Sequence, residues 1–303
     1  MNKWGFWHGF SMRIKRKKWM RKDSAAAWIF LIPSGVGFAL FYLIPFAMGL
    51  FYSFVDNTVD SRFVGLDNYR ELLASDSFRK AASNTFYFSA VSVPLNLALS
   101  LGLAMLLNTD MHLRKWLRTA SVLPLVVPVA SIVLIWQILF DWNGSINAWL
   151  SGFAVEPVDW MKSEAARNVI IVVYLWKNIG YNIILFLAGL QQIPKDYYDT
   201  AQTEGAGSLR QFVSITLVYL TPTMFFVVIL SIMNSFKVFR ETYLIAGDYP
   251  HDSIYMMQHY MNNTFTSLDI QKLTAAATLM AGCILLIVMG LFTLDRRYRK
   301  FME

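Results

Sequence analysis

The chain has one cysteine, Cys283, and it lies within an apolar stretch. A disulfide within the chain and a cysteine-based metal site are therefore excluded. The four histidines, His8, His112, His251 and His259, are scattered with no pair at the spacing of metal ligands, and we predict no metal site. The phosphate-binding motif G-x-x-x-x-G-K-[ST] is absent. No catalytic constellation is visible either, so we expect a protein that is not an enzyme.

Charged residues are also scarce. They make up 16% of the chain, and apolar residues make up 56%. Soluble domains carry about 25% charged residues. The apolar residues form long uncharged blocks with neither the strand nor the helix period of an amphipathic surface, which indicates a membrane protein in contact with lipid. The net charge of +7 is judged by its distribution along the chain, and we predict no nucleic-acid partner.

Six blocks are long enough to cross a bilayer as helices, which takes about 20 apolar residues. Barrel strands would alternate in polarity, and these blocks do not. The predicted fold is therefore an all-α membrane protein with six transmembrane helices. The predicted spans are residues 28–55, 86–107, 119–140, 169–190, 217–236 and 273–294.

The loops differ in charge. Residues 1–27 hold eight Lys or Arg residues and one acid, and residues 108–118 and 295–303 are also basic. The other three loops together hold nine Lys or Arg residues and thirteen acids: 56–85, 141–168 and 237–272. Because positive residues are enriched on the cytoplasmic side, we predict that both termini are cytoplasmic.

The predicted domain organisation is a cytoplasmic basic segment (1–27), a permease domain (28–294) and a basic tail (295–303). The N-terminal segment resembles a signal peptide, but its apolar run is too long and no cleavage site is evident. Its interleaved aromatic and basic residues fit a membrane-surface segment or a disordered tail equally well. Either Met1 or Met12 is the true start.

Polar residues within the spans are candidate functional residues. Lys177 lies inside the fourth predicted span, with Asn178 and Asn182 on one helix face. Hydrogen bonds between helices are the structural alternative. A cavity with amide partners and aromatic faces would suit a polyhydroxylated ligand. The candidate substrate pathway comprises Trp136, Gln137, Lys177, Asn178, Tyr181, Asn182, Asn234 and Lys237.

Residues 191–216 form an unusually long and half-apolar loop. Pro194 favours a helix start, and Lys195–Thr203 is predicted as a short helix. Gly205 and Gly207 permit a sharp break before a second helix that runs into the fifth span. Such a loop suits insertion into a groove of a partner protein, and a membrane-surface helix is the alternative.

This loop resembles the Glu-Ala-Ala coupling loop of binding-protein-dependent ABC importer permeases. Asp199, Thr200 and Ala201 stand at the Glu-Ala-Ala positions, and Gly205 stands at the glycine. Asp199, Thr200, Glu204 and Val218 depart from the usual Glu, Ala, Asp and Pro. Residues 63–69, 84–85, 104–108, 187–191 and 235–239 also match sugar-type permeases, whereas residues 247–250 replace the usual G-G-P. The chain thus resembles the first permease of maltose- or glycerol-phosphate-type carbohydrate importers.

The resemblance implies a MetI-like fold in a bacterial cell membrane. It also implies a second homologous permease, two ABC ATPase subunits, an extracytoplasmic sugar-binding protein and a carbohydrate substrate, with an oligosaccharide as the expected class. ATP and Mg would bind the partner ATPase, and this chain would hold no cofactor. The residues implied to couple to the ATPase are Tyr198, Asp199, Thr200, Ala201, Glu204, Gly205 and Ala206.

A secondary, ion-coupled transporter of a polar solute is the alternative. Prolines interrupt several predicted spans, but the two halves show no convincing repeat. A membrane enzyme would need clustered His, Asp or Cys residues, and a channel would need a repeated charged ring. The importer is the interpretation that accounts for the loop 191–216.

Overall fold

A computed structural model describes residues 27–109 and 114–302, and most of them are helical. Five helices are long and apolar enough to span a membrane, and one bent pair is a sixth candidate. The predicted all-α membrane fold is confirmed. The five are Ala27–Tyr52, α4 (Asp76–Asn108), α8 (Ala166–Leu190), Ser208–Ala246 and Ile270–Arg297, the last within α14 (Ile270–Met302).

The predicted third span is broken. It falls on α5 (Arg114–Val126) and α6 (Val129–Leu139), which meet at an angle of 101°. Pro128 stands at the break with extended backbone angles, φ −58° and ψ 138°. Proline lacks the N–H that would continue the helix and disfavours helical geometry at the residue before it. Residues 119–140 are therefore a broken span or a re-entrant loop and not the single straight helix that their composition predicts.

Shorter helices connect the spans. The helix Ala27–Tyr52 contains a π-helical turn, η1 (Ala39–Leu43), and continues as α2 (Ile44–Tyr52). The helix Ser208–Ala246 is divided into α10 (Ser208–Gln211), η2 (Phe212–Thr216), α11 (Leu217–Ser235) and α12 (Phe239–Ala246). The other connecting helices are α3 (Asp67–Ala74), α7 (Ser145–Ser151), α9 (Lys195–Thr203), η3 (Asp252–Ile254) and α13 (Met257–Thr266).

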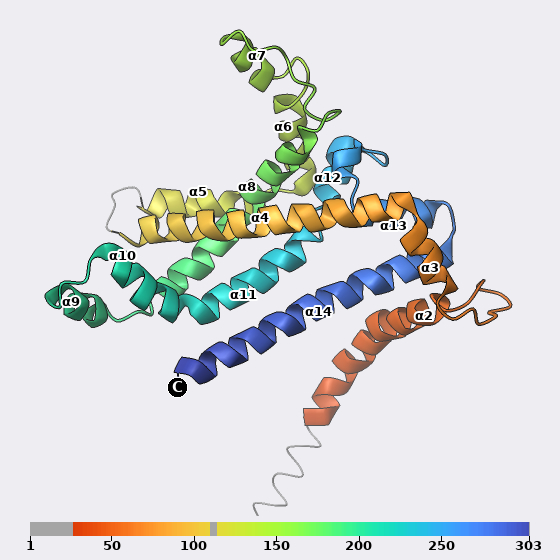
Figure 1. Cartoon of the computed structure of the whole chain (residues 1–303), viewed down its shortest axis with the longest axis horizontal. Coiled ribbons are helices and arrows are strands. Elements are labelled where there is room, and N and C mark those ends of the chain that lie inside the picture. Colours follow the sequence, from red (N-terminus) through yellow and green to blue (C-terminus); the bar gives the residue numbers. More distant parts are fainter. Residues whose placement is uncertain (1–26, 110–113, 303) are drawn as a thin grey trace, which may run out of the picture.

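The core lies where α8 packs against α4, α5 and α11 (Figure 1). Phe88 of α4 and Tyr174 of α8 meet edge to face with ring centroids 5.3 Å apart. At Gly180 the backbone of α8 approaches α5 so closely that a Cβ would lie 1.7 Å from the carbonyl oxygen of Ser121. Small residues allow this kind of close helix packing in membranes, where lipid removes the hydrophobic drive between helices.

The helix Ala27–Tyr52 lies apart from this core and beside α14 (Figure 1). None of its residues is buried within the described part of the chain, and Phe30 is 82% exposed. Such an apolar surface requires cover from lipid or from another protein. The predictions for residues 1–26, including the surface segment and the choice between Met1 and Met12, lie outside the described residues.

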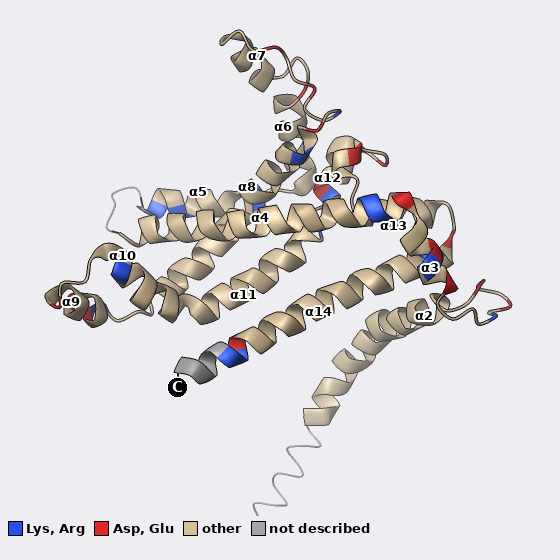
Figure 2. Cartoon of the chain, viewed as in Figure 1, with Lys and Arg blue, Asp and Glu red and all other residues tan. Residues whose placement is uncertain are grey.

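Charged residues gather at the helix ends and around α12, while the bodies of α4, α11 and α14 are almost free of them (Figure 2). In Figure 1 the C-terminal end of α14 and the loop that contains α9 lie toward one end of the long helices. The helices α3 and α13 lie toward the other end. This separation is the arrangement expected if the basic loops share one side of the membrane.

Candidate functional site

A polar cavity of about 440 Å³ opens beside the middle of α8, where the turn 236–238 separates α11 from α12. Its volume is within the range of small-ligand sites. The wall is built from α5, α8, α11, α12 and α13 and the turn itself. The lining residues are Leu125, Tyr174, Lys177, Asn178, Asn234, Lys237, Val238, Phe239, Arg240, Glu241 and Gln258.

Four of the predicted pathway residues meet in this cavity: Lys177, Asn178, Asn234 and Lys237. They come from two segments more than 50 positions apart in the chain. The fold therefore brings together residues that the sequence analysis selected only because they are polar residues in or next to apolar spans. Asn178 also donates through Nδ2 to the carbonyl oxygen of Tyr174, one turn earlier in α8, at 2.8 Å. That bond fixes the amide at the cavity wall.

Glu241 lines the cavity and is a candidate that the sequence analysis missed. Its side chain is 4% exposed and forms an ion pair with Lys177, whose side chain is 25% exposed. A buried carboxylate is stabilised by such a partner, because an unpaired buried charge is strongly disfavoured. The available signal was Lys177 itself, since a lone cation within a span requires a partner.

Asn182 does not line the cavity. It is buried, and its Nδ2 donates to Ser231 Oγ on α11 at 3.0 Å. The hydroxyl of Tyr174 donates to the carbonyl oxygen of Ser231 at 2.8 Å. These contacts link α8 to α11 beside the cavity. For Asn182 the structural alternative, a hydrogen bond between helices, is the one observed.

The remaining pathway candidates also lie outside the cavity lining. Trp136 packs edge to face against Trp176 at 5.7 Å and stacks on Phe140. Gln137 Nε2 donates to the carbonyl oxygens of Leu244 and Ile245, which joins α6 to α12. Tyr181 is 39% exposed on α8. Trp136 and Gln137 thus hold the broken span in place beside the cavity and are not part of the cavity wall.

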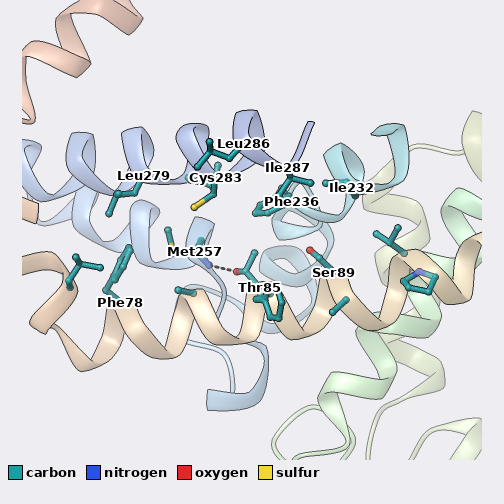
Figure 3. Close-up of a pocket in the computed structure, with 17 residues that line it drawn as sticks. Phe78, Thr85, Ser89, Ile232, Phe236, Met257, Leu279, Cys283, Leu286 and Ile287 are labelled. Carbon is teal, nitrogen blue, oxygen red and sulfur yellow. Dashed lines mark hydrogen bonds between the residues drawn. The ribbon is translucent and has the colours of Figure 1, made fainter. Parts of the chain in front are cut away.

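A second pocket, of about 770 Å³, lies between α4, α11, α13 and α14 (Figure 3). Its lining is almost wholly apolar and includes Phe78, Leu279, Cys283 and Leu286. The Thr85 hydroxyl already accepts a hydrogen bond from the Met257 amide at 2.9 Å. Few polar groups remain for a hydrated ligand, so this pocket does not suit a sugar.

The loop 191–216 has the predicted form. The helix α9 spans Lys195–Thr203 directly after Pro194, which stands at the N-cap. The chain then reverses at Gly205, whose φ of +81° is a left-handed conformation that favours glycine. The amide of Ala206 closes the turn by donating to the carbonyl oxygen of Ala201 at 2.8 Å.

Two tyrosines hold α9 against the start of the next helix. The Tyr198 hydroxyl lies 2.9 Å from the Thr216 hydroxyl, and the Tyr197 ring lies 5.1 Å from that of Tyr219. The opposite side of α9 is open, and none of its residues is buried. Asp199 and Glu204 are exposed, and no side-chain partner for either occurs within the described residues. The acidic side of α9 is therefore exposed, while its tyrosine side packs against the following helix.

The seven residues assigned to the loop by resemblance lie on α9 or on the turn after it. Thr200, like Asp199 and Glu204, is on the exposed side, whereas Tyr198, Ala201 and Ala206 are half-buried toward the supporting helix. Gly205 supplies the reversal. The seven residues are thus neighbours in the structure, but only some of them face outward.

Residues 96–300 match the family model described as "Binding-protein-dependent transport system inner membrane component". This match includes the loop, the cavity and four of the long helices. It begins within α4 and ends near the end of α14.

Curated relatives match most of the chain. The chain is 29% identical to "Probable ABC transporter permease protein YesP" of Bacillus subtilis, over 93% of this chain and 92% of that protein. It is 31% identical to "Trehalose/maltose transport system permease protein MalF" of Thermococcus litoralis, over 76% of this chain and 79% of that protein.

A solved structure shares the fold. It is described as "Crystal structure of a bacterial ABC transporter involved in the import of the acidic polysaccharide alginate". The TM-score is 0.81 at 22% sequence identity, over 93% of this chain and 99% of the matched chain. At that identity the likeness establishes the arrangement of the helices and nothing finer.

Proposed function

The chain belongs to the family of binding-protein-dependent transport system inner membrane components, and we propose that it forms half of the translocation pathway of an ATP-driven carbohydrate importer. Its relatives include a permease named for trehalose and maltose transport. An oligosaccharide is the proposed substrate class. The cavity beside α8 is the proposed part of the pathway, because Asn178, Asn234 and Gln258 offer amides to sugar hydroxyls.

The observation that carries the proposal is the geometry of α9. The helix has no buried residue, is supported by Tyr197 and Tyr198, and ends at the left-handed Gly205. An exposed, rigidly supported helix of this kind fits a groove on a partner protein. We propose that α9 inserts into a cleft of a cytoplasmic ABC ATPase, with Asp199 and Glu204 facing the partner.

The complete importer then contains further subunits. A second homologous permease supplies the other half of the pathway, two ATPase subunits bind ATP and Mg, and an extracytoplasmic protein delivers the sugar. The chain is a permease subunit, and ATP hydrolysis is assigned to the partner ATPase. The proposed location is the inner membrane of a bacterial cell, with both termini on the cytoplasmic side.

Coupling follows from the position of α9. The loop is continuous with the helix Ser208–Ala246, which reaches the cavity through α11 and α12. Closure of the ATPase pair on ATP would displace α9 as a rigid body and shift α11 relative to α8. Such rigid-body motions can link a distant site to a cavity, and we propose that they alternate its access between the two sides.

The test is affinity purification of the tagged chain from its native membranes in mild detergent, followed by mass spectrometry. The proposal predicts recovery of an ABC-type ATPase and a second permease. Recovery of the chain alone, or as a homo-oligomer without an ATPase, would favour the ion-coupled alternative and remove the role assigned to α9.

A further inference from the structure

The polar cavity has an excess of positive charge. Three cationic side chains line it, Lys177, Lys237 and Arg240, against one carboxylate, that of Glu241. The other polar side chains in the lining are neutral. A cavity built only for neutral sugars needs hydroxyl and amide partners and aromatic faces, and gains nothing evident from this excess.

Only one of the three cations is neutralised within the described part of the chain. Lys177 pairs with Glu241. Lys237 and Arg240 are exposed on the cavity side, and neither has an ion pair or a side-chain hydrogen bond among the described residues. Both lie just after the end of α11, Lys237 in the turn 236–238 and Arg240 in the first turn of α12. Two cations without a carboxylate partner at one cavity raise the local concentration of anions there.

We propose that this cavity selects an acidic saccharide, and that Lys237 and Arg240 recognise its carboxylate or phosphate group. This inference rests on the proposed function and names the substrate class of the same site. The Arg240 guanidinium offers a planar pair of donors that matches either anion, and Lys237 adds a point charge. The amides of Asn178, Asn234 and Gln258 remain for hydroxyl groups.

The Lys177–Glu241 pair explains why the two remaining cations are available. Glu241 is 4% exposed and pairs with Lys177, and it forms no ion pair with Lys237 or Arg240. An acidic residue of the second permease is the competing source of negative charge. If such a residue occupies the cavity, the importer has no preference for acidic sugars, and sugar-binding measurements distinguish the two cases.

The experiment measures sugar binding to the intact complex of permeases and ATPases in lipid nanodiscs, without the external binding protein. The probes are radiolabelled galacturonate trisaccharide and maltotriose, with glucose 1-phosphate as a competitor. We expect the acidic trisaccharide to bind at least about tenfold more tightly at low salt, and the preference should shrink as salt screens the charges. Competition by glucose 1-phosphate at similar concentrations would assign the site to phosphate esters as well as carboxylates.

The variants are Lys237→Gln, Arg240→Gln and the double variant. Each single change should weaken binding of the acidic trisaccharide about three- to tenfold, and the double change should abolish the preference while altering maltotriose binding less than about twofold. Arg70→Gln is the matched control. Arg70 is an exposed cation outside the cavity, paired with Asp67, and its replacement should leave both affinities unchanged.

Equal or tighter binding of maltotriose, or an unchanged preference in the double variant, would overturn the inference. If neither trisaccharide binds while the complex still contains its ATPase, the assignment to acidic sugars is wrong and the importer assignment stands. If no ATPase accompanies the chain, the proposed function itself fails.

Discussion

Lys177 at the middle of α8 and Glu241 in α12 form an ion pair that joins two helices at the wall of the polar cavity. The pair connects residues 64 positions apart, and Glu241 is almost fully buried. It holds α12 against α8 just beyond the break at 236–238. The position of α12, and with it one wall of the cavity, therefore depends on this contact.

Removal of Lys177 should be more damaging than removal of Glu241. Lys177→Met leaves a buried carboxylate without a partner, and loss of one member of a buried pair costs about 3–5 kcal/mol. Glu241→Gln leaves a cation that still reaches the cavity, so its cost should be smaller. The double variant should recover most of the thermal stability lost in Lys177→Met. Thermal unfolding of the purified complex measures this, and equal losses in both single variants would contradict it.

Gly180→Ala should disrupt packing of α8 on α5. The added methyl group would lie 1.7 Å from the Ser121 carbonyl oxygen, which is backbone and must move. We expect a lower melting temperature and weaker sugar binding, because α8 and α5 both line the cavity. Gly282→Ala is the control, since a Cβ there meets nothing within 4 Å. Similar melting temperatures for the two variants would show that α5 does not approach α8 this closely.

Gly205→Ala should release the ATPase. The left-handed conformation costs about 1–2 kcal/mol for a residue with a side chain, and relief of that strain would reorient α9. At Gly207 an added Cβ would also meet open space, but the backbone there is ordinary, with φ −69°. Gly207→Ala is therefore the control. Co-purification of the ATPase should drop in the first variant only. Equal recovery of the ATPase from both would separate α9 from coupling.

Acid should destabilise the protein through His259. Burial lowers the pKa of His259 to about 4, with the carboxylate of Asp248 acting weakly in the opposite direction. Between that value and the ordinary pKa of 6.5, the unfolded chain binds a proton that the folded chain does not. Stability should therefore fall as pH drops through this range, by at most about 1.4 kcal/mol per pH unit from this residue.

The measurement is the melting temperature of the purified complex from neutral pH down to the lowered pKa of His259. In the unmodified protein the Met256 amide donates to His259 Nδ1. His259→Gln removes the titrating group and keeps a side-chain acceptor for that amide. This variant should show a shallower pH dependence. Identical slopes in the unmodified protein and this variant would show that His259 does not titrate in this way.

Labelling of single cysteines should place α9 in the cytoplasm. Cys283→Ala gives a background without cysteine. Val59→Cys should then react with a membrane-impermeant maleimide in intact cells, because Val59 is 88% exposed in a loop predicted to lie outside. Thr200→Cys on α9 should react only after the membrane is permeabilised. The reverse pattern would invert the predicted orientation.

Local features of the sequence were sufficient to predict most of the helices. The predicted first span, 28–55, corresponds to the helix Ala27–Tyr52, and the predicted loop helix Lys195–Thr203 has the observed bounds. Both predictions depend on neighbouring residues alone. The first span follows from an uncharged apolar run, and the loop helix follows from Pro194 before it and Gly205 after it. The family resemblance is confirmed by the match over residues 96–300, and the ion-coupled alternative is left without support.

Features that depend on distant contacts were not predicted. The sequence analysis predicted one straight span where the structure bends by 101° at Pro128. Hydropathy does not distinguish a kinked apolar run from a straight one. Glu241 was counted as one acid of an outer loop, and only the fold shows that it reaches Lys177. Asn178 and Asn182 share a helix face by spacing, yet one lines the cavity and the other bonds to Ser231.

The energy source of transport is the most direct test of the central claim. The purified complex, reconstituted into liposomes with its external binding protein, would be assayed for uptake of the galacturonate trisaccharide and maltotriose. We predict accumulation of at least one of them only when ATP is supplied on the side that carries α9, with none in its absence. Accumulation driven by an ion gradient without ATP would contradict the account and identify the chain as a secondary transporter.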